Sequence, residues 1–554
     1  MTRIAIGCLM PMVPTHPNAM QANTQTLFVS LPTSSLVAVQ VPPAPATTVI
    51  VKVISGDNRI DPLLDDAAFR FNVGSPVGTA VTVTFSFPTS VPASYTGEDI
   101  LGWKPFSEQQ KTATREILSQ LQQQTKITFQ EVAESANSTG RMRFSNNTQE
   151  SSAGYAFLPN STSDTDDRDA DTWIAIGTDT NVERGTHAWA TLVHEIGHAV
   201  GLNHPGNYNA GVAPKVDAVG NFLSADEDAF FNSIMSYRSS AQEIQPTVFM
   251  PYDMLALRYV YGTNPVATGN TTYTYSDAAG RLVENIVDDG GVDTLDFSAV
   301  TAGVMLNLTP GAYSSVGKLA SGANALANLT TSFDAMIENA IGTVANDTML
   351  GNAAHNRFTG GLGNDTIDGS SGVDTAVFLA QKANYALAKS ANGWTIGDSM
   401  GAEGNDTLAN VERLQFSDKK FALDLGATEN GGLALQFIGL MAPEMVKLPN
   451  IVGTILTIFD EGKTMQQVCQ LAIDVGLVTA IAGANTNQAL AAMAYKNLLG
   501  VQAGADVIDM LVGYMDGRSA KYTQTEFMTV VAGLELNQTH IGLVGLQQTG
   551  VEYM

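Results

Sequence analysis

Alternating and four-residue hydrophobic patterns mark the first predicted elements of the chain. Residues 81–87 alternate apolar and polar side chains as a strand does, and shorter strand-like segments follow at 127–132, 141–145, 155–158 and 172–176. Ser107 begins a capping-box sequence, after which Ala113, Ile117 and Leu121 form an apolar stripe at helical spacing. A second helix is predicted over about 187–201. Strands and helices in this order predict an α+β domain that ends near Gly262.

From about residue 280 the pattern changes to Gly, Asp, Asn and Thr with single large apolar residues. Units of nine residues begin at Gly342, Gly351, Gly360 and Gly369. Their sixth residues are Asp347, Asn356, Asp365 and Asp374, and their eighth residues are Met349, Phe358, Ile367 and Ala376. This period is typical of the calcium-binding parallel β-roll, in which each half-turn contains a short strand. We therefore expect the eighth residue of each unit to point inward.

In such a roll, glycine-rich backbone and a carboxylate from each half-turn would bind calcium. Two half-turns make one coil, so we expect Asp347 to share a calcium with the loop of Asp365, and Asn356 with that of Asp374. Only the unit 360–368 matches the repeat fully, which predicts a short array with some weak or empty sites. A Gly/Asn/Asp-rich loop region without metal is the alternative. The expected calcium residues are Asp293, Gly342, Asp347, Asn356, Gly360, Gly361, Gly363, Asp365, Gly372, Asp374 and Asp406.

Residues after about 427 are rich in Ala, Leu, Met and Gln and again show helical spacing. Residues 486–499, followed by Gly500, have the start and stop signals of a helix. A further helical face is formed by Met465, Val468, Cys469, Ala472 and Ile473. We expect a small helical domain with no visible chemistry, in which His540 is a surface or packing residue.

Composition narrows the functional classes. The 554 residues carry a formal charge of −26 and only 28 Lys plus Arg, which argues against nucleic acid and anionic membranes as partners. An acidic chain of this kind suits calcium binding and solubility outside the cell. The two cysteines, Cys8 and Cys469, allow neither a disulfide framework nor a Cys-based zinc site. No apolar run approaches the length of a transmembrane segment, and residues 451–459 come nearest.

The N-terminal 55 residues are rich in Pro, Val, Thr and Ala. Arg3 and the apolar residues 4–10 allow a short signal peptide, but prolines at 12, 14 and 17 interrupt the apolar region. An extended leader, and candidate pro-segment, is therefore preferred. The expected domains are this leader (1–55), the α+β domain (56–265), the roll (266–426) and the helical domain (427–554).

The strongest chemical signal lies in residues 194–204, His-Glu-Ile-Gly-His-Ala-Val-Gly-Leu-Asn-His. Histidines four apart on a helix share one face, so His194 and His198 can bind one zinc, with Glu195 beside them as a general base. Gly201 can take a left-handed conformation that ends the helix and turns His204 toward the same ion. Three nitrogen ligands leave a fourth position for water, as in catalytic zinc sites. His187 is expected to be structural.

Further segments resemble one family, the serralysin-type metzincins with RTX repeats. Residues 233–237, Ser-Ile-Met-Ser-Tyr, resemble the family's methionine turn, and residues 204–211 and the roll extend the resemblance over roughly residues 56–425. The resemblance implies that Met235 forms an apolar floor under the histidines and that Tyr237 binds the zinc and stabilises the oxyanion. Arg238 departs from the family, which usually has Trp there, and this difference bears on specificity.

The resemblance implies a multidomain fold: an α+β metzincin protease domain, an all-β parallel β-roll (RTX) domain and a small, mainly α C-terminal domain. It also implies a secreted zinc endopeptidase with Glu195 and Tyr237 as catalytic residues, one catalytic zinc, and several structural calcium ions. Protein or peptide substrates would pair with an edge strand near Tyr155 and Phe157, although core packing is the alternative reading of these two side chains.

Export by a type I secretion apparatus is implied as well, and residues 550–554 loosely resemble its C-terminal signal. A different class of function remains open, a cell-surface or adhesion protein whose protease domain is accessory or inert. The two combine if residues 427–554 attach an active protease to a cell surface.

Overall fold

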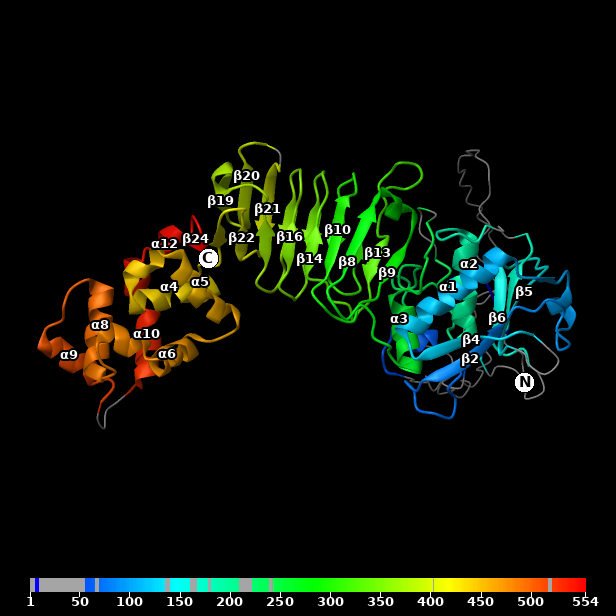
Figure 1. Ribbon diagram of the computed structural model, residues 1–554, viewed down its shortest axis with the longest axis horizontal. Coiled ribbons are helices and arrows are strands. Elements are labelled where there is room, and N and C mark those ends of the chain that lie inside the picture. The colour runs from blue at the N-terminus through cyan, green and yellow to red at the C-terminus, as the bar shows by residue number, and fades with distance from the viewer. Residues whose placement is uncertain are drawn as a thin grey trace, which may run out of the picture. The chain divides into compact units, whose positions relative to one another are not determined.

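The computed structural model describes residues 55–64, 69–134, 140–159, 167–177, 181–208, 222–238, 242, 244–401, 403–516 and 521–554, and the backbone of residues 5–8. Most of the predicted leader and residues 209–211 of the family-like segment therefore lie outside the described residues. The chain divides into two compact units, Met1–Asn264 and Pro265–Met554 (Figure 1).

The first unit is built on a mixed sheet with the strand order β1-β6-β7-β5-β2-β4, and β3 pairs with β5. The pairs β2–β4, β2–β5 and β5–β7 run parallel, whereas the pairs β1–β6, β6–β7 and β3–β5 are antiparallel. The strands are β1 (Ala5–Cys8), β2 (Val81–Ser86), β3 (Lys104–Pro105), β4 (Ile127–Glu131), β5 (Met142–Asn147), β6 (Gly154–Phe157) and β7 (Thr172–Ala175). The predicted mixture of strands and helices is thus confirmed.

Three helices accompany this sheet in the described part of the unit: α1 (Glu108–Gln124), α2 (His187–Ala199) and α3 (Pro251–Tyr261). Ser107 caps α1 by accepting the backbone N–H of Gln110, and the predicted apolar stripe of this helix is buried. Helix α2 packs on β6 and β7, and its residues from Ala188 onward are all buried. Burial on every side places α2, with its histidines, in the interior of the unit.

The second unit begins as a coil of short parallel strands. One sheet has the order β24-β23-β22-β18-β16-β14-β10-β8, another β11-β15-β17-β21-β20-β19, and a third β12-β13-β9. The strands are β8 (Thr272–Ser276), β9 (Glu284–Ile286), β10 (Thr294–Ala299), β11 (Met305–Asn307), β12 (Tyr313–Ser314), β13 (Leu329–Thr331), β14 (Asn339–Ile341), β15 (Thr348–Leu350), β16 (Arg357–Thr359), β17 (Thr366–Asp368), β18 (Thr375–Val377), β19 (Tyr385–Ser390), β20 (Gly393–Asp398), β21 (Asn405–Ala409), β22 (Arg413–Gln415), β23 (Lys420–Ala422) and β24 (Val551–Tyr553).

The nine-residue period sets the register of this coil. Met349 of β15 lies opposite Ile367 of β17, and Phe358 of β16 opposite Ala376 of β18, each eighteen residues on. All four side chains are buried in the core of the coil, as predicted for the eighth position. After β18 the hairpin β19–β20 interrupts the repeat, and β21 continues the stack on β17.

Helices fill the C-terminal part of the second unit: α4 (Asn430–Met441), α5 (Pro449–Asp460), α6 (Met465–Asp474), α7 (Leu477–Ala482), α8 (Asn487–Leu499), α9 (Ala505–Val512), α10 (Gln524–Ala532), α11 (Glu535–His540) and α12 (Leu543–Leu546). Their apolar faces form a core of their own, which includes the predicted face of α6. The chain then returns to the coil, because β24 pairs antiparallel with β23. In the described part of the chain, no helix has the length and apolarity needed to cross a bilayer.

Candidate active site

Helix α2 carries two of the three histidines. Thr186 caps it by accepting the backbone N–H of Trp189, and the helix ends just after His198. His194 and His198 lie one turn apart, and their imidazole centroids are 4.8 Å apart. The predicted one-face arrangement of this pair is therefore present.

A tight turn at Gly201 returns the chain to the helix. The φ angle of Gly201 is +106°, in the region that favours glycine, and the N–H of Leu202 donates to the carbonyl of Gly197 at 2.9 Å. The turn brings His204, ten residues after His194, to the pair on α2. His204 is 5% exposed, so the site is almost closed to solvent on this side.

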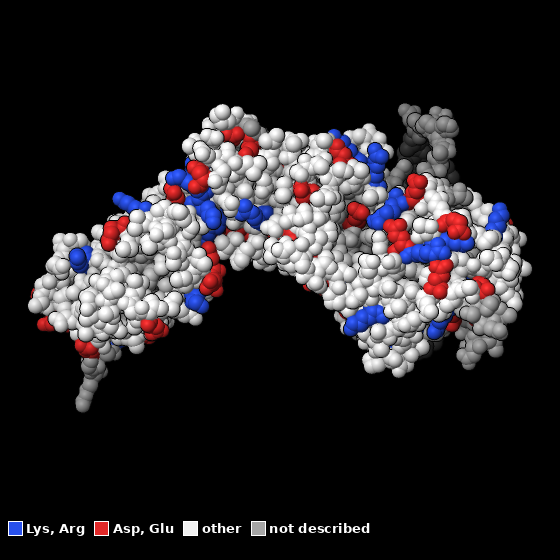
Figure 2. Space-filling model, in the orientation of Figure 1, with Lys and Arg blue, Asp and Glu red and all other residues white. Residues whose placement is uncertain are grey.

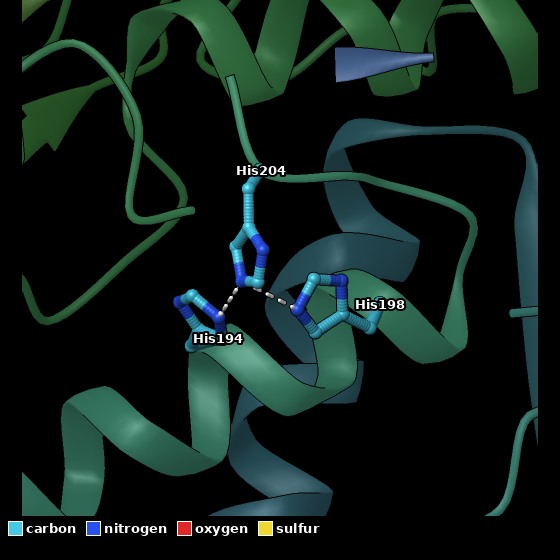
Figure 3. Close-up of side chains that lie close together, drawn as sticks. All are labelled: His194, His198 and His204. Carbon is cyan, nitrogen blue, oxygen red and sulfur yellow. Dashed lines mark hydrogen bonds between the residues drawn. The ribbon is translucent and has the colours of Figure 1, made fainter. Parts of the chain in front are cut away.

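The three imidazoles converge through their Nε2 atoms (Figure 3). Nε2 of His204 lies 3.2 Å from Nε2 of His194 and 3.1 Å from Nε2 of His198. Zn–N bonds of about 2.0–2.1 Å in a tetrahedral site separate the nitrogens by about 3.3 Å, so the geometry fits one zinc ion. Among the described residues, these are the one set of three His, Cys, Asp or Glu side chains whose ligand atoms lie within 4.8 Å of one another.

Backbone carbonyls orient the two helix histidines. Nδ1 of His194 lies 2.8 Å from the carbonyl oxygen of Ile234, and Nδ1 of His198 lies 2.7 Å from that of Leu202. A carbonyl can only accept, so each Nδ1 carries the proton and each Nε2 offers its lone pair to a metal. Burial lowers the pKa of His194 to about 4 and that of His198 well below its usual value, which keeps both rings neutral.

Glu195 is fully buried beside the histidines, and neither of its carboxylate oxygens has a hydrogen-bond partner among the described residues. Burial raises its pKa well above the usual carboxyl value. A Cβ built on Gly154 would lie 2.8 Å from Cγ of Glu195, so strand β6 passes directly by this side chain. An unpartnered buried carboxylate next to a metal-ligand set suits a group that handles a proton of water or substrate.

Met235 lies against helix α2 at Gly197, which stands between His194 and His198. A Cβ on Gly197, between the two ligands of α2, would come 2.5 Å from the sulfur of Met235. The turn that carries Met235 is held by Asp253 of α3, which accepts the hydroxyl of Ser233 at 2.6 Å and the N–H of Ile234 at 2.8 Å. Asp253 thus supports the carbonyl of Ile234, which orients His194.

Tyr237 also lies beside the histidines. Its ring centroid is 4.3 Å from that of His204 and 5.9 Å from that of His194. Arg238, the residue that departs from the family pattern, is more than half exposed and its guanidinium donates to the carbonyl of Ala225 at 2.7 Å. The ring of Tyr237 therefore lies beside the three histidines, and the neighbouring guanidinium of Arg238 is exposed to solvent.

Two aromatic residues of β6 prove to be packing residues. Phe157 is buried and Tyr155 is stacked on Trp173 with a centroid separation of 4.9 Å. The hydroxyl of Tyr155 donates to Asp99 at 2.9 Å. Core packing therefore accounts for both side chains, whereas the outer backbone edge of β6 pairs with β1. His187 begins α2 and does not belong to the metal set.

The predicted calcium residues of the roll form two rows. In one, each backbone N–H donates to the carboxylate of the next coil: Val304 to Asp347 at 2.7 Å, Asp347 to Asp365 at 2.8 Å and Asp365 to Asp406 at 2.9 Å. In the other, the N–H of Asn356 donates to Asp374 at 2.6 Å. These side chains are buried, although many other Lys, Arg, Asp and Glu residues lie on the surface (Figure 2).

The predicted glycines lie where the coils approach most closely. A Cβ on Gly342 would be 2.0 Å from the carbonyl oxygen of Gly360, and φ is positive at Gly361, Gly363 and Gly372. One carboxylate oxygen each of Asp293, Asp365 and Asp374 is buried without a hydrogen-bond partner among the described residues. The carboxylates form rows rather than a cluster of three, so a cation here would need backbone carbonyls as further ligands.

Sequence reasoning missed several residues that complete these sites. Glu338 and Glu412 extend the second row by accepting the N–H of Asp293 at 2.7 Å and of Asp374 at 2.8 Å. Glu338 lies nine residues before Asp347, one unit before the first that the sequence analysis recognised, and Glu412 follows the hairpin β19–β20 that breaks the period. Asp253 and Asp228, which accept hydrogen bonds from the turn around Met235, belong to no motif. Each would have required knowledge of a partner distant in sequence.

Comparisons with known proteins agree with both units. Residues 71–247 match the model of metallo-peptidase family M12, and residues 256–510 match that of the peptidase M10 serralysin C terminal. Metallopeptidase AprA of Pseudomonas marginalis is 32% identical over 324 residues, which cover 53% of this chain and 64% of that relative. Serralysin of Proteus mirabilis is 31% identical over 318 residues, covering 50% of this chain and 61% of the relative.

Serralysin A of Dickeya chrysanthemi is 31% identical over 311 residues, covering 50% of this chain and 60% of that protein. The matched region thus spans less than two thirds of the length of these relatives. The chain combines a metallopeptidase-type unit that holds a three-histidine site with a serralysin-type C-terminal region, and it is similar to the serralysins.

Proposed function

We propose that this chain is a secreted zinc-dependent endopeptidase of the serralysin type, with a metzincin catalytic domain, that hydrolyses protein substrates. One observation carries the proposal: three Nε2 atoms converge at zinc-compatible distances beside a buried carboxylate without a partner. His194, His198 and His204 would hold the zinc, with Tyr237 as a further ligand in the resting enzyme. The similarity to metallopeptidases over both units supports this choice of reaction.

In the proposed mechanism, zinc would polarise the scissile carbonyl and lower the pKa of the attacking water. Glu195 accepts a proton from that water and returns it to the leaving amine, a role that its raised pKa and its buried position suit. Tyr237 donates a hydrogen bond to the oxyanion that develops on the carbonyl. The neutral states of His194 and His198 leave their Nε2 lone pairs to the metal.

Substitution of Glu195 by Gln tests this function. The variant keeps the size of the side chain but loses the base, so casein hydrolysis should fall about 10²–10⁴-fold while zinc content stays at the wild-type level. Glu150→Gln, an exposed glutamate of the same unit, is the matched control and should leave activity unchanged. Unchanged hydrolysis by the Glu195 variant would refute this function, and inactivity of the wild-type chain would favour the alternative, a surface or adhesion protein with an inert protease domain.

We further propose that the leader, residues 1–55, acts as a pro-segment. Strand β1 pairs antiparallel with the outer edge of β6, with Gly7 opposite Tyr155 and Cys8 opposite Gly154. That edge passes Glu195 and is where an extended substrate would add a strand. A chain lacking residues 1–54 should therefore hydrolyse casein faster than the full chain. N-terminal sequencing of the secreted protein should place a cut after Cys8; an intact N-terminus on fully active enzyme would contradict the proposal.

For the roll, we propose several structural calcium ions in an RTX-type array. The two carboxylate rows and the unpartnered buried oxygens of Asp293, Asp365 and Asp374 support it. Asp347 and Asp406 in the first row, with carbonyls of the glycine turns, would supply the remaining ligands. Calcium would offset the repulsion between stacked carboxylates and so favour folding outside the cell.

Export through a type I secretion apparatus, with attachment to the cell surface through residues 427–554, completes the proposal. The similarity to serralysins supports secretion. Fractionation of a culture that produces the full chain separates the two final locations: recovery in the medium alone would contradict surface attachment, and retention inside the cells would contradict secretion.

A further inference from the structure

Tyr237 is held by its backbone as well as by its ring. Its ring stacks on that of Tyr208, with centroids 4.8 Å apart and planes inclined by 22°. Its backbone N–H donates to the hydroxyl oxygen of Tyr208 at 3.1 Å. The next N–H along the chain, that of Arg238, donates to the hydroxyl oxygen of Ser236 at 3.1 Å. The peptide groups on both sides of Tyr237 are therefore each bound by one hydroxyl.

A single carboxylate oxygen directs both hydroxyls. Oδ1 of Asp228 accepts the hydroxyl of Tyr208 at 2.7 Å and that of Ser236 at 2.6 Å. A carboxylate can only accept, so both hydroxyl protons point to Asp228 and both hydroxyl lone pairs face the N–H groups around Tyr237. The other oxygen, Oδ2, lies 3.4 Å from Nε of Arg238, which balances the buried charge. Asp228 is only 3% exposed, so water does not substitute for these contacts.

We propose that Asp228 is the positioning residue of Tyr237: it holds the phenol beside the histidine set by orienting Tyr208 and Ser236. The proposal rests on the proposed function, because it assigns Asp228 to the phenol that would bind zinc and the oxyanion. Asp228 contacts Tyr208, Ser236 and Arg238, and through the first two hydroxyls it acts on the backbone around Tyr237. Its removal should therefore disturb the reaction more than substrate binding.

Two substitutions of Asp228 separate hydrogen-bond acceptance from bulk and charge. Asp228→Ala removes the shared acceptor and should lower kcat about 10–100-fold, the range for groups that orient metal-site residues, with KM nearly unchanged. Asp228→Asn keeps a carbonyl oxygen for both hydroxyls and should retain kcat within about threefold. Tyr208→Phe, which removes the hydroxyl that joins Asp228 to the N–H of Tyr237, should also lower kcat. A rise in KM with kcat little changed across these variants would overturn the proposal.

A double-substitution cycle with Tyr237→Phe shows whether Asp228 acts through Tyr237. If it does, Asp228→Ala added to Tyr237→Phe should lower kcat by less than about threefold, because the positioned hydroxyl is already absent. A purely structural role would give the same factor in both backgrounds, and that result would overturn the inference. Inactivity of the wild-type chain, or activity independent of Glu195, would instead refute the proposed function itself.

A spectroscopic measurement provides a readout apart from activity. With Cu²⁺ bound in place of zinc, a coordinated phenolate gives a charge-transfer absorption band in the visible region. The wild-type protein and Asp228→Asn should show the band, Tyr237→Phe should lack it, and Asp228→Ala should weaken it at equal copper content. An unchanged band in Asp228→Ala would contradict the positioning role. If Asp228→Ala does not fold, Tyr208→Phe serves as the test variant, with a weakened band expected and an unchanged band contradicting the role.

Discussion

The three-histidine site and the carboxylate rows of the roll would hold the proposed cations in opposite ways. In the first unit, neutral nitrogen donors meet at one point, and backbone carbonyls of Ile234 and Leu202 orient two of them. In the second unit, acceptor groups repeat along the coil, and each also receives a backbone N–H from the neighbouring coil. One site is a single convergence of distant segments, whereas the other is a periodic array.

Because of this difference, we expect the metal of the first unit to serve the reaction and the cations of the second unit to serve folding. Neutral imidazoles can remain buried and close together without a metal, so the first site is prepared by the fold around it. Buried carboxylates in rows repel one another when ionised, so the second site is costly without cations. Loss of the first metal should therefore abolish the reaction and spare the fold, and loss of the second should weaken the fold.

The largest expected effect is the loss of one imidazole. His198→Ala leaves two nitrogen donors, so bound zinc should fall well below one ion per chain. Casein hydrolysis should fall at least as far as the about 10²–10⁴-fold expected for loss of the general base. Metal analysis and a casein assay measure both, and far-UV circular dichroism should remain that of the wild type. Unfolding of this variant would show that the first unit, like the roll, depends on its metal for folding.

Removal of one charge from the roll should act on folding rather than on catalysis. Asp365→Asn lies in the middle of the first row, and it should raise the calcium concentration at the folding midpoint about tenfold, or about 1.4 kcal/mol. Asp368→Asn, three residues on and outside the rows, is the matched control and should shift the midpoint far less. A calcium titration followed by circular dichroism measures both midpoints. Equal midpoint shifts in the two variants would contradict calcium binding by the row.

The floor of the histidine site should tolerate no added atom. Gly197→Ala places a Cβ 2.5 Å from the sulfur of Met235, and overpacking of this kind costs about 1–3 kcal/mol. Zinc affinity should fall with the stability, because Gly197 lies between two ligands on α2. Gly545→Ala in α12, where nothing lies within 4 Å, should be neutral or slightly stabilising. Denaturant unfolding of both variants checks the difference, and equal stabilities would show that the floor adapts.

The smallest expected effect is a pH dependence of the metal-free roll. Burial raises the pKa of Asp365, Asp374 and Asp406 to about 7, above the value expected in the unfolded chain. Such groups contribute stability fully below pH of about 4 and lose that contribution as the pH rises through about 7. The Tm of the second unit's transition in metal-free protein should therefore fall by several degrees over this range.

Saturating calcium should reverse that trend, because calcium binds the ionised carboxylates. Scanning calorimetry with and without calcium measures the two slopes. A metal-free Tm that rises with pH over this range would show that the fold does not raise the pKa of these carboxylates.

Much of the fold could be predicted from local patterns. The stripe of Ala113, Ile117 and Leu121 predicted α1, and the nine-residue period predicted strands whose eighth residues are buried. The helix with His194 and His198 and the break at Gly201 also follow from neighbouring residues. In each case the residues that define the feature lie within one or two turns of each other, so sequence spacing alone is informative.

Other features depended on contacts between distant segments. The hairpin β19–β20 interrupts the repeat, and β24 returns from the chain's end to pair with β23. Asp253 reaches back to the turn of Met235, and Asp228 joins Tyr208 to Ser236 across twenty-eight residues of chain. A single carboxylate in a helix or loop has no spacing signal, so its partners could not be read from the sequence.

The sequence by itself determined which groups are available for chemistry: three imidazoles, one carboxylate beside them, and a repeated array of aspartates and glycines. Periodicity and the special backbone freedom of glycine suffice for that, because both act over a few residues. Only the tertiary structure decided how those groups are oriented and buried, and which side chains support them. Orientation depends on carbonyls and carboxylates brought from far along the chain, and these contacts exist only once the chain has folded.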